Sequence, residues 1–98
     1  MDYKNPNAIV STDWLSDNID GPNISIVDAS FYLPAANRDP KIEFNKCHIP
    51  KAVFFDINEI ADQSTDLPHM LPDPNQFSEQ ISNLGISNDT HVICYDTN

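Results

Sequence analysis

The chain of 98 residues is long enough for one small domain, and its hydrophobic content of 40% is that of a globular protein rather than a disordered tail. Its 15 acidic and 5 basic residues give a formal net charge of -10, and so few cations argue against nucleic acid or an anionic membrane surface as a partner. Since no apolar run could cross a bilayer and the first residues lack the apolar core of a secretory signal, we expect a cytoplasmic protein.

The first expected elements are a short helix and a strand. Ser11 or Thr12 is placed to cap a helix over residues 13–19. The segment Ile24–Asp28 that follows is almost continuously apolar and rich in β-branched residues, which favours a strand of a buried parallel sheet.

A second helix and a second strand are expected in the middle of the chain. Asp39 and Pro40 have the pattern of a helix cap followed by proline in the first turn. The helix must be brief, because the residue before a proline is pushed into an extended conformation and Ile49-Pro50 follows soon after. Residues 52–56 then predict a strand.

The last third of the chain predicts a loop, a helix and a strand. Residues 62–72 hold two prolines and many polar side chains, so they predict a loop long enough to be functional. Asp73 is expected to cap the clearest helix, with Gln76 completing a capping-box pattern and Gly85 ending the helix. Residues 92–95 predict a third strand.

Strands that alternate with helices predict an α/β fold with about three parallel strands and flanking helices. Asp28, Asp56 and Asp96 each stand at the carboxyl end of one strand, which is where ligands bind in such sheets. No helix follows the third strand to cover it, so we expect the domain to be incomplete.

Six phrases occur in a fixed order, namely VDASFYLP at 27–34, RDP at 38–40, HIP at 48–50, AVFFDI at 52–57, PHMLP at 68–72 and HVICYD at 91–96. Together they resemble the N-terminal domain of the two-domain rhodanese family, closest to the mercaptopyruvate and thiosulfate sulfurtransferases. The resemblance implies that residues 1–98 are a truncated, non-catalytic, N-terminal rhodanese-like domain.

The resemblance also implies a function, which is transfer of a sulfane sulfur from thiosulfate or 3-mercaptopyruvate to a thiol or cyanide. The PHMLP phrase favours 3-mercaptopyruvate over thiosulfate as the sulfur donor. In the family the sulfur is held by a cysteine in a glycine-rich loop of the second domain, where backbone amides stabilise the thiolate. The only glycines here, Gly21 and Gly85, lie outside any such loop, and Asp96 matches the position of that cysteine in the active copy.

Because a carboxylate cannot accept sulfur, we expect the chain alone to be inactive. We also expect no cofactor and no metal site. A small-molecule sulfur donor would bind only together with the missing C-terminal domain.

His69, in the long proline-rich loop, is the candidate catalytic residue. The resemblance implies a proton relay of serine, histidine and an acid, with the serine supplied by the missing domain. Asn58 stands where the acid is expected, and it can orient a neutral imidazole while stabilising an imidazolium poorly. One of three nearby aspartates, Asp56, Asp62 or Asp66, could take the place of the relay acid. A His69 that is purely structural or solvent-exposed is an equal alternative.

Other polar residues have architectural interpretations. We expect His48 to tie its loop to a buried acid such as Asp28, because buried polar groups need partners. Arg38 and Asp39 are expected to form a local ion pair and helix cap. The family usually has glycine at the position of Lys51, so a positive φ there would strain the lysine.

The two cysteines are expected to be passive free thiols. Cys94 lies within an apolar strand, where a cysteine usually acts as a small buried hydrophobe. Cys47 lies between Lys46 and His48, a setting that favours a thiolate only slightly.

Three hypotheses follow. The first is a fragment of a sulfurtransferase that is inactive alone. The second is a non-catalytic remnant or binding module that pairs with another polypeptide through its open sheet edge. The third is a complete thiol enzyme that uses Cys47.

Overall fold

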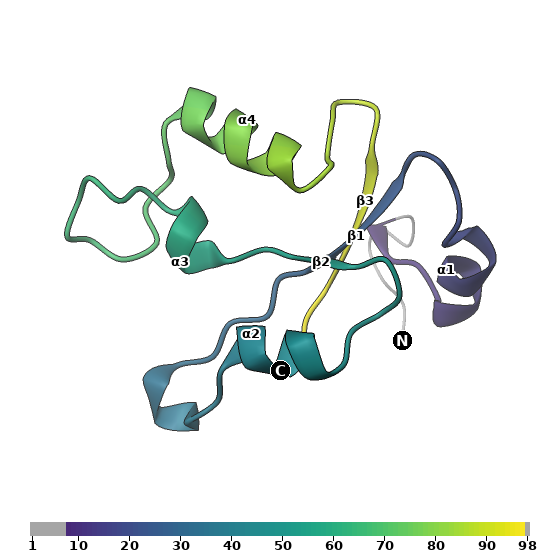
Figure 1. Ribbon diagram of the computed structural model, residues 1–98, viewed down its shortest axis with the longest axis horizontal. Helices are drawn as coiled ribbons and strands as arrows, with labels where there is room; N and C mark the ends of the chain where they lie inside the picture. Colours follow the sequence, from purple (N-terminus) through teal and green to yellow (C-terminus); the bar gives the residue numbers. More distant parts are fainter. Residues whose placement is uncertain (1–7, 98) are drawn as a thin grey trace.

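The computed structural model describes residues 8–97 of the chain, and its centre is a small parallel sheet. Strand β1 (Ile24–Asp28) lies between β2 (Val53–Phe54) and β3 (His91–Tyr95), and both neighbours run parallel to it. Figure 1 shows the three strands crossing the middle of the molecule. The predicted α/β architecture with three parallel strands is therefore confirmed for the described residues.

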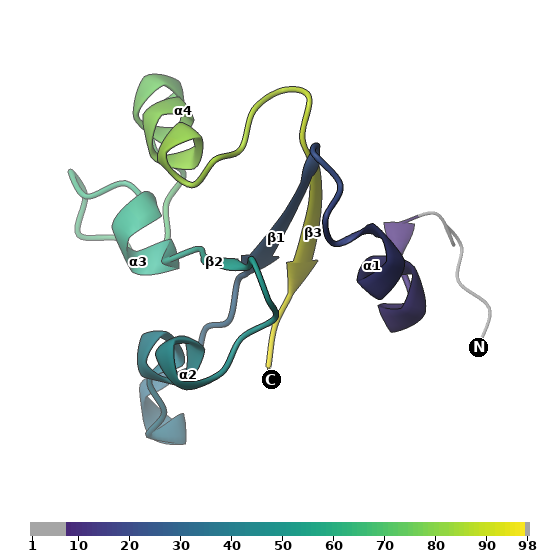
Figure 2. The ribbon, with the colours of Figure 1, turned by 45° about the vertical axis from the view of Figure 1, so that its right-hand side comes forward.

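Helices surround the sheet. In Figure 2, α1 (Thr12–Asn18) lies to the right of the strands, while α2 (Pro40–Lys46), α3 (Ile57–Ile60) and α4 (Pro74–Asn83) lie to the left. One turn of 3₁₀ helix, η2 (Pro34–Ala36), precedes α2. No helix of the described residues is both long and apolar enough to cross a membrane.

The buried core follows the central strand. Ile26 and Val27 of β1 are only 2% and 3% exposed, because β1 has a strand on each side. Ala52, Ile60 and Ala61 complete the buried apolar set together with Tyr32. Burial therefore concentrates on β1 and on the segments on either side of β2 in the chain.

Side-chain caps begin the three longer helices, as the sequence predicts. Ser11 Oγ accepts a hydrogen bond from the amide of Trp14 at 3.0 Å, and Asp39 Oδ1 accepts from Lys41 N at 2.9 Å. Asp73 Oδ2 accepts from Gln76 N at 3.3 Å. Each cap satisfies a first-turn amide that has no partner within its helix.

The predicted strand over residues 52–56 is shorter in the structure, and a helical turn absent from the sequence prediction follows it. Only Val53–Phe54 pair with β1. Asp56 instead turns the chain into α3, because its carboxylate accepts a hydrogen bond from the amide of Asn58 at 3.0 Å. The strand thus ends where this cap begins.

The expectation that Cys94 is buried is wrong, since its side chain is exposed. Within residues 8–97, β3 pairs only with β1 and therefore lies at the edge of the sheet. An apolar strand sequence does not by itself bury a side chain when no element covers that part of the strand.

Candidate functional site

His69 and Asn58 are joined by a hydrogen bond, although they lie on different segments of the chain. The distance from His69 Nε2 to Asn58 Oδ1 is 3.1 Å. The ring of Phe31 meets the His69 ring edge to face, with centroids 4.8 Å apart and an angle of 89° between the planes. The structure therefore brings the two predicted residues together and adds an aromatic partner.

The capped turn of α3 and the loop after it position this pair. The Asp56 cap fixes the start of α3 and hence the backbone of Asn58. The amide of Asp62 donates to the carbonyl of Met70 at 2.8 Å, which closes the loop around His69. His69 itself has a φ of +55°, in the left-handed region. The side chains of His69 and Asn58 are both exposed at the surface.

Two of the three aspartates that could have replaced the relay acid are engaged elsewhere. Asp56 accepts from the amide of Asn58, as described above. Asp62 accepts hydrogen bonds from the hydroxyl and amide of Ser64 at 2.7 and 2.9 Å, and these bonds hold the pKa of Asp62 below its ordinary value. Asn58 is thus the hydrogen-bond partner that the structure gives to His69, whereas the catalytic role of the pair stays a prediction.

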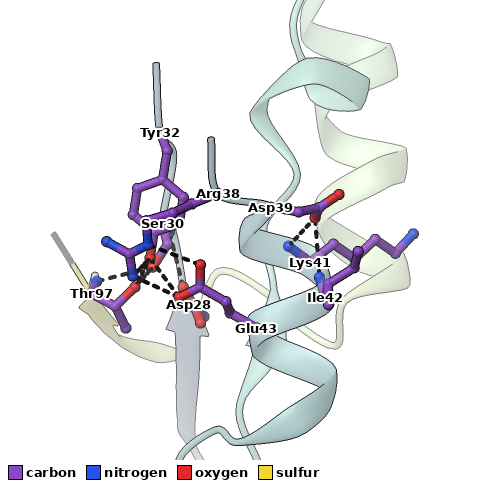
Figure 3. A network of polar contacts seen from close by, with 9 residues as sticks. All are labelled: Asp28, Ser30, Tyr32, Arg38, Asp39, Lys41, Ile42, Glu43 and Thr97. Carbon is purple, nitrogen blue, oxygen red and sulfur yellow. Dashed lines mark hydrogen bonds and ion pairs between the residues drawn. The ribbon is translucent and has the colours of Figure 1, made fainter. Parts of the chain in front are cut away.

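A second group of polar side chains lies where β1 and β3 end (Figure 3). Thr97 N donates to Ser30 Oγ at 3.1 Å, and the hydroxyls of these two residues lie 3.2 Å apart. The hydroxyl of Tyr32 contacts that of Thr97 and accepts from Arg38 Nη2 at 2.9 Å. This network connects the segment after β3 to the segment before α2.

Arg38 forms its ion pair with Glu43 rather than with Asp39, so that expectation is corrected. Its Nη2 lies 2.6 Å from Glu43 Oε1, and its Nε donates to Oε2 at 3.0 Å. This paired hydrogen bonding lowers the pKa of Glu43 and raises that of Arg38. The guanidinium also lies over the Tyr32 ring, 3.9 Å from its centroid. Asp39 is occupied with capping α2, so its carboxylate faces the helix amides instead.

Asp28 is the buried acid at the end of β1, with only 3% of its surface exposed. Its Oδ1 accepts a hydrogen bond from the amide of Ser30 at 2.9 Å. Tyr95, at the end of β3, accepts a bond from Ile49 N at 3.4 Å. Burial, with a contribution from the Asp28 charge, raises the pKa of Tyr95 above 10.0.

The expectation that His48 binds a buried acid is wrong. Its Nδ1 lies 2.8 Å from the carbonyl oxygen of Phe44, and its ring stacks on the Phe44 ring at a centroid distance of 4.2 Å. The carbonyl of Phe44 lies one helical turn back from His48, so His48 completes the end of α2. Its role is architectural, as expected, with a different partner.

The remaining candidates lie at the surface. Asp96 follows β3 directly and is exposed. Cys47 and Cys94 are both exposed free thiols. No three His, Cys, Asp or Glu side chains between residues 8 and 97 are grouped so that they could hold a metal ion.

A hollow of about 300 Å³ lies beside the His69 pair. Its lining residues include Phe31 and Asn58 as well as Arg38 and Lys41. No local sequence pattern predicts the contact of Phe31 with His69, because it joins segments that are far apart in the chain.

Residues 11–98 match the family model of the rhodanese-like domain. The chain belongs to the rhodanese family. It is 47% identical over 88 residues to thiosulfate/3-mercaptopyruvate sulfurtransferase 1 of Arabidopsis thaliana, covering 90% of this chain and 23% of that protein. It is 44% identical over 88 residues to 3-mercaptopyruvate sulfurtransferase of Escherichia coli, covering 89% of this chain and 31% of that one.

Two solved structures are similar as well. The crystal structure of the Escherichia coli 3-mercaptopyruvate sulfotransferase SseA superposes with a TM-score of 0.82 at 44% identity, covering 90% of this chain and 34% of that one. The Tum1 protein of Saccharomyces cerevisiae gives 0.77 at 34% identity, with coverages of 90% and 30%. The rhodanese-like fold is thus confirmed, and the chain spans about a quarter to a third of these two-domain relatives, near their N-terminal domain.

Proposed function

We propose that this chain forms the N-terminal part of the substrate cleft of a sulfurtransferase and does not itself hold the transferred sulfur. The observation that supports this most is the alignment of nine-tenths of the chain with 3-mercaptopyruvate and thiosulfate sulfurtransferases at 44–47% identity. The hydrogen-bonded pair of His69 and Asn58 supplies a group that can move a proton at that cleft.

The chemistry explains the division of work. A thiolate attacks the sulfur of 3-mercaptopyruvate, a sulfur–sulfur bond forms, and the carbon–sulfur bond breaks. Its electron pair stays on the three-carbon product, which is released as an enolate and must take up a proton. We assign that proton transfer to His69 and the thiolate to a cysteine outside these residues, because Asp96 cannot accept sulfur.

The first test measures the chain alone. Purified protein incubated with thiosulfate and cyanide should form no thiocyanate above the buffer rate. Turnover that Cys47→Ser abolishes and Cys94→Ser leaves intact would replace this proposal with a complete thiol enzyme.

The second test measures the chain in a full-length setting. A chimera in which this chain replaces the aligned 88 residues of the Escherichia coli relative should keep sulfurtransferase activity. In the chimera, His69→Ala should lower kcat by about 100-fold or more, as loss of a general acid–base group does. His91→Ala, at the start of β3, is the matched control. A folded chimera without activity, or one indifferent to His69→Ala, would refute the proposal.

A second candidate function is a binding module that accepts a β-strand from another polypeptide. His91 N donates to Asn23 O at 2.7 Å, and Tyr95 O accepts from Ala29 N at 2.9 Å. Because backbone groups of a parallel strand alternate between its two sides, those of Val92 and Cys94 point away from β1. Val92 is also 37% exposed. The outer side of β3 thus presents donors, acceptors and an apolar side chain to an incoming strand.

Coexpression with the Escherichia coli relative that lacks its aligned N-terminal residues tests this candidate. A complex should form, and the amides of Val92 and Cys94 should exchange hydrogen more slowly than in the free chain. Val92→Lys should weaken the complex, whereas Asn88→Lys, in the loop before β3, should leave it unchanged. A complex without protection of the two amides would exclude the strand-addition mode.

A further inference from the structure

Three side chains from three segments meet at His69. Asn58 comes from α3, Phe31 from the segment after β1, and His69 from the loop before α4. The backbone of His69 is itself in the left-handed region, which histidine adopts more readily than bulkier or β-branched residues do. The ring is therefore held at its backbone, at one nitrogen and across one face or edge.

The partner of Nε2 determines where the ring proton lies. The amide oxygen Oδ1 of Asn58 has lone pairs and no hydrogen, so it can only accept. The Nε2 of His69, at 3.1 Å, must then be the donor. In the neutral ring the other nitrogen, Nδ1, has the lone pair.

We infer that Asn58 and Phe31 are positioning residues that hold His69 as the Nε2–H tautomer, with Nδ1 as the nitrogen that takes up a proton and then passes it on. Phe31 fixes the plane of the ring through the edge-to-face contact, since the positive edge of one ring faces the negative face of the other. Asn58 fixes how the His69 ring is turned within that plane, because it binds one of the two ring nitrogens. The use of Nδ1 in sulfur transfer rests on the proposed function, whereas the tautomer does not.

His48 provides an internal control with the opposite arrangement. Its Nδ1 lies 2.8 Å from the backbone carbonyl of Phe44, and a carbonyl oxygen also can only accept. His48 is therefore the Nδ1–H tautomer. Both histidines are exposed and each contacts one phenylalanine ring, so solvent access alone does not separate them.

Long-range nitrogen–proton NMR spectra of the imidazole rings test the inference on the 98-residue chain. In mildly alkaline solution, His69 should give the pattern of the Nε2–H tautomer and His48 that of the Nδ1–H tautomer. Asn58→Ala should turn the His69 pattern into that of a ring averaging between tautomers and leave His48 unchanged. An Nδ1–H pattern for His69, or an averaged one in the unmodified chain, would overturn the inference.

Phe31 is tested by substitution with and without an aromatic ring. Phe31→Leu should broaden or average the His69 signals while Phe31→Tyr preserves them, and Phe44→Leu should affect His48 only. In the active chimera, Phe31→Leu should lower kcat by roughly tenfold to a hundredfold with little change in KM, as misplaced groups do. Unchanged His69 signals in Phe31→Leu would remove Phe31 from the inference. If the NMR signals of the chain match the inference but His69→Ala leaves the activity of the chimera unchanged, only the proposed function is refuted.

Discussion

Thr97 is joined to Ser30 by its backbone and by its side chain, since its amide donates to Ser30 Oγ at 3.1 Å and its hydroxyl lies 3.2 Å from the same atom. Ser30 is 3% exposed and follows β1, whereas Thr97 follows β3. One buried hydroxyl therefore connects the segments that leave two adjacent parallel strands.

Removing that hydroxyl should destabilise the domain. In Ser30→Ala the amide of Thr97 loses its acceptor in a partly buried place, and we expect a loss of about 1–3 kcal/mol in the free energy of unfolding. Urea denaturation monitored by circular dichroism measures it. Ser78→Ala, on the exposed face of α4, is the control and should change stability by less than about 0.5 kcal/mol. Equal effects of the two variants would contradict the role of the Ser30 hydroxyl.

Lys51 has a φ of +69°, and glycine should be better than lysine at this position. Lys51→Gly should raise the free energy of unfolding by about 0.5–1 kcal/mol. The left-handed region costs a residue with a Cβ about 1–2 kcal/mol, and glycine avoids this cost. Part of the gain is cancelled because glycine loses more conformational entropy on folding. Lys51→Ala is the matched control. It also removes the exposed ion pair with Asp20 but keeps the Cβ, so it should not stabilise the protein. Alanine and glycine variants of equal stability would contradict strain at this position.

The ion pair of Arg38 and Glu43 should make stability depend on pH in the acid range. The hydrogen bonds from Arg38 lower the pKa of Glu43 from an ordinary value of 4.5. A carboxyl whose pKa is lower in the folded state stabilises the fold above its unfolded pKa, and this contribution is lost as pH falls through the folded pKa.

Glu43→Gln should therefore be less stable than the unmodified chain near neutral pH. The difference should shrink as pH falls below about 4.5 and disappear only once pH is below the lowered pKa of Glu43 in the folded state. Urea midpoints at a series of pH values measure this difference, which added salt should reduce because the pair is exposed. Glu79→Gln on α4 serves as the control. A difference that persists in strong acid would show that Glu43 acts through packing instead of charge.

Both cysteines should react with a thiol reagent in the folded protein. Cys47 and Cys94 are exposed, so Ellman's reagent should modify two thiols without denaturant, and Cys94→Ser should reduce the count to one. A native chain with a single reactive thiol would show that Cys94 is covered in solution.

The features that local sequence predicts well are those decided within a few residues. The caps at Ser11, Asp39 and Asp73 were predicted because each depends on a side chain and an amide two or three positions later. Lys51, where the family usually has glycine, has the positive φ that such a pattern allows for.

The features that sequence did not predict depend on competition between distant partners. His48 could bind a buried acid or a nearby carbonyl, and only the three-dimensional position of Phe44 decides between them. The burial of Cys94 depends on what lies beyond β3, and the contact of Phe31 with His69 depends on how two loops meet. The short helix α3 forms because Asp56 caps it. The sequence does not predict it, because a single turn is too short to show a helical periodicity.

The outward side of β3 has a consequence for the behaviour of the protein in concentrated solution. Two such edges on different molecules could join their unpaired backbone groups and begin an ordered aggregate. The net charge of -10 opposes this approach, because like-charged molecules repel each other at distances up to the Debye length of about 10 Å at 0.1 M salt. Colloidal stability should therefore depend on ionic strength and on pH near the isoelectric point of about 4.2, where the repulsion disappears and strand-to-strand precipitation becomes possible.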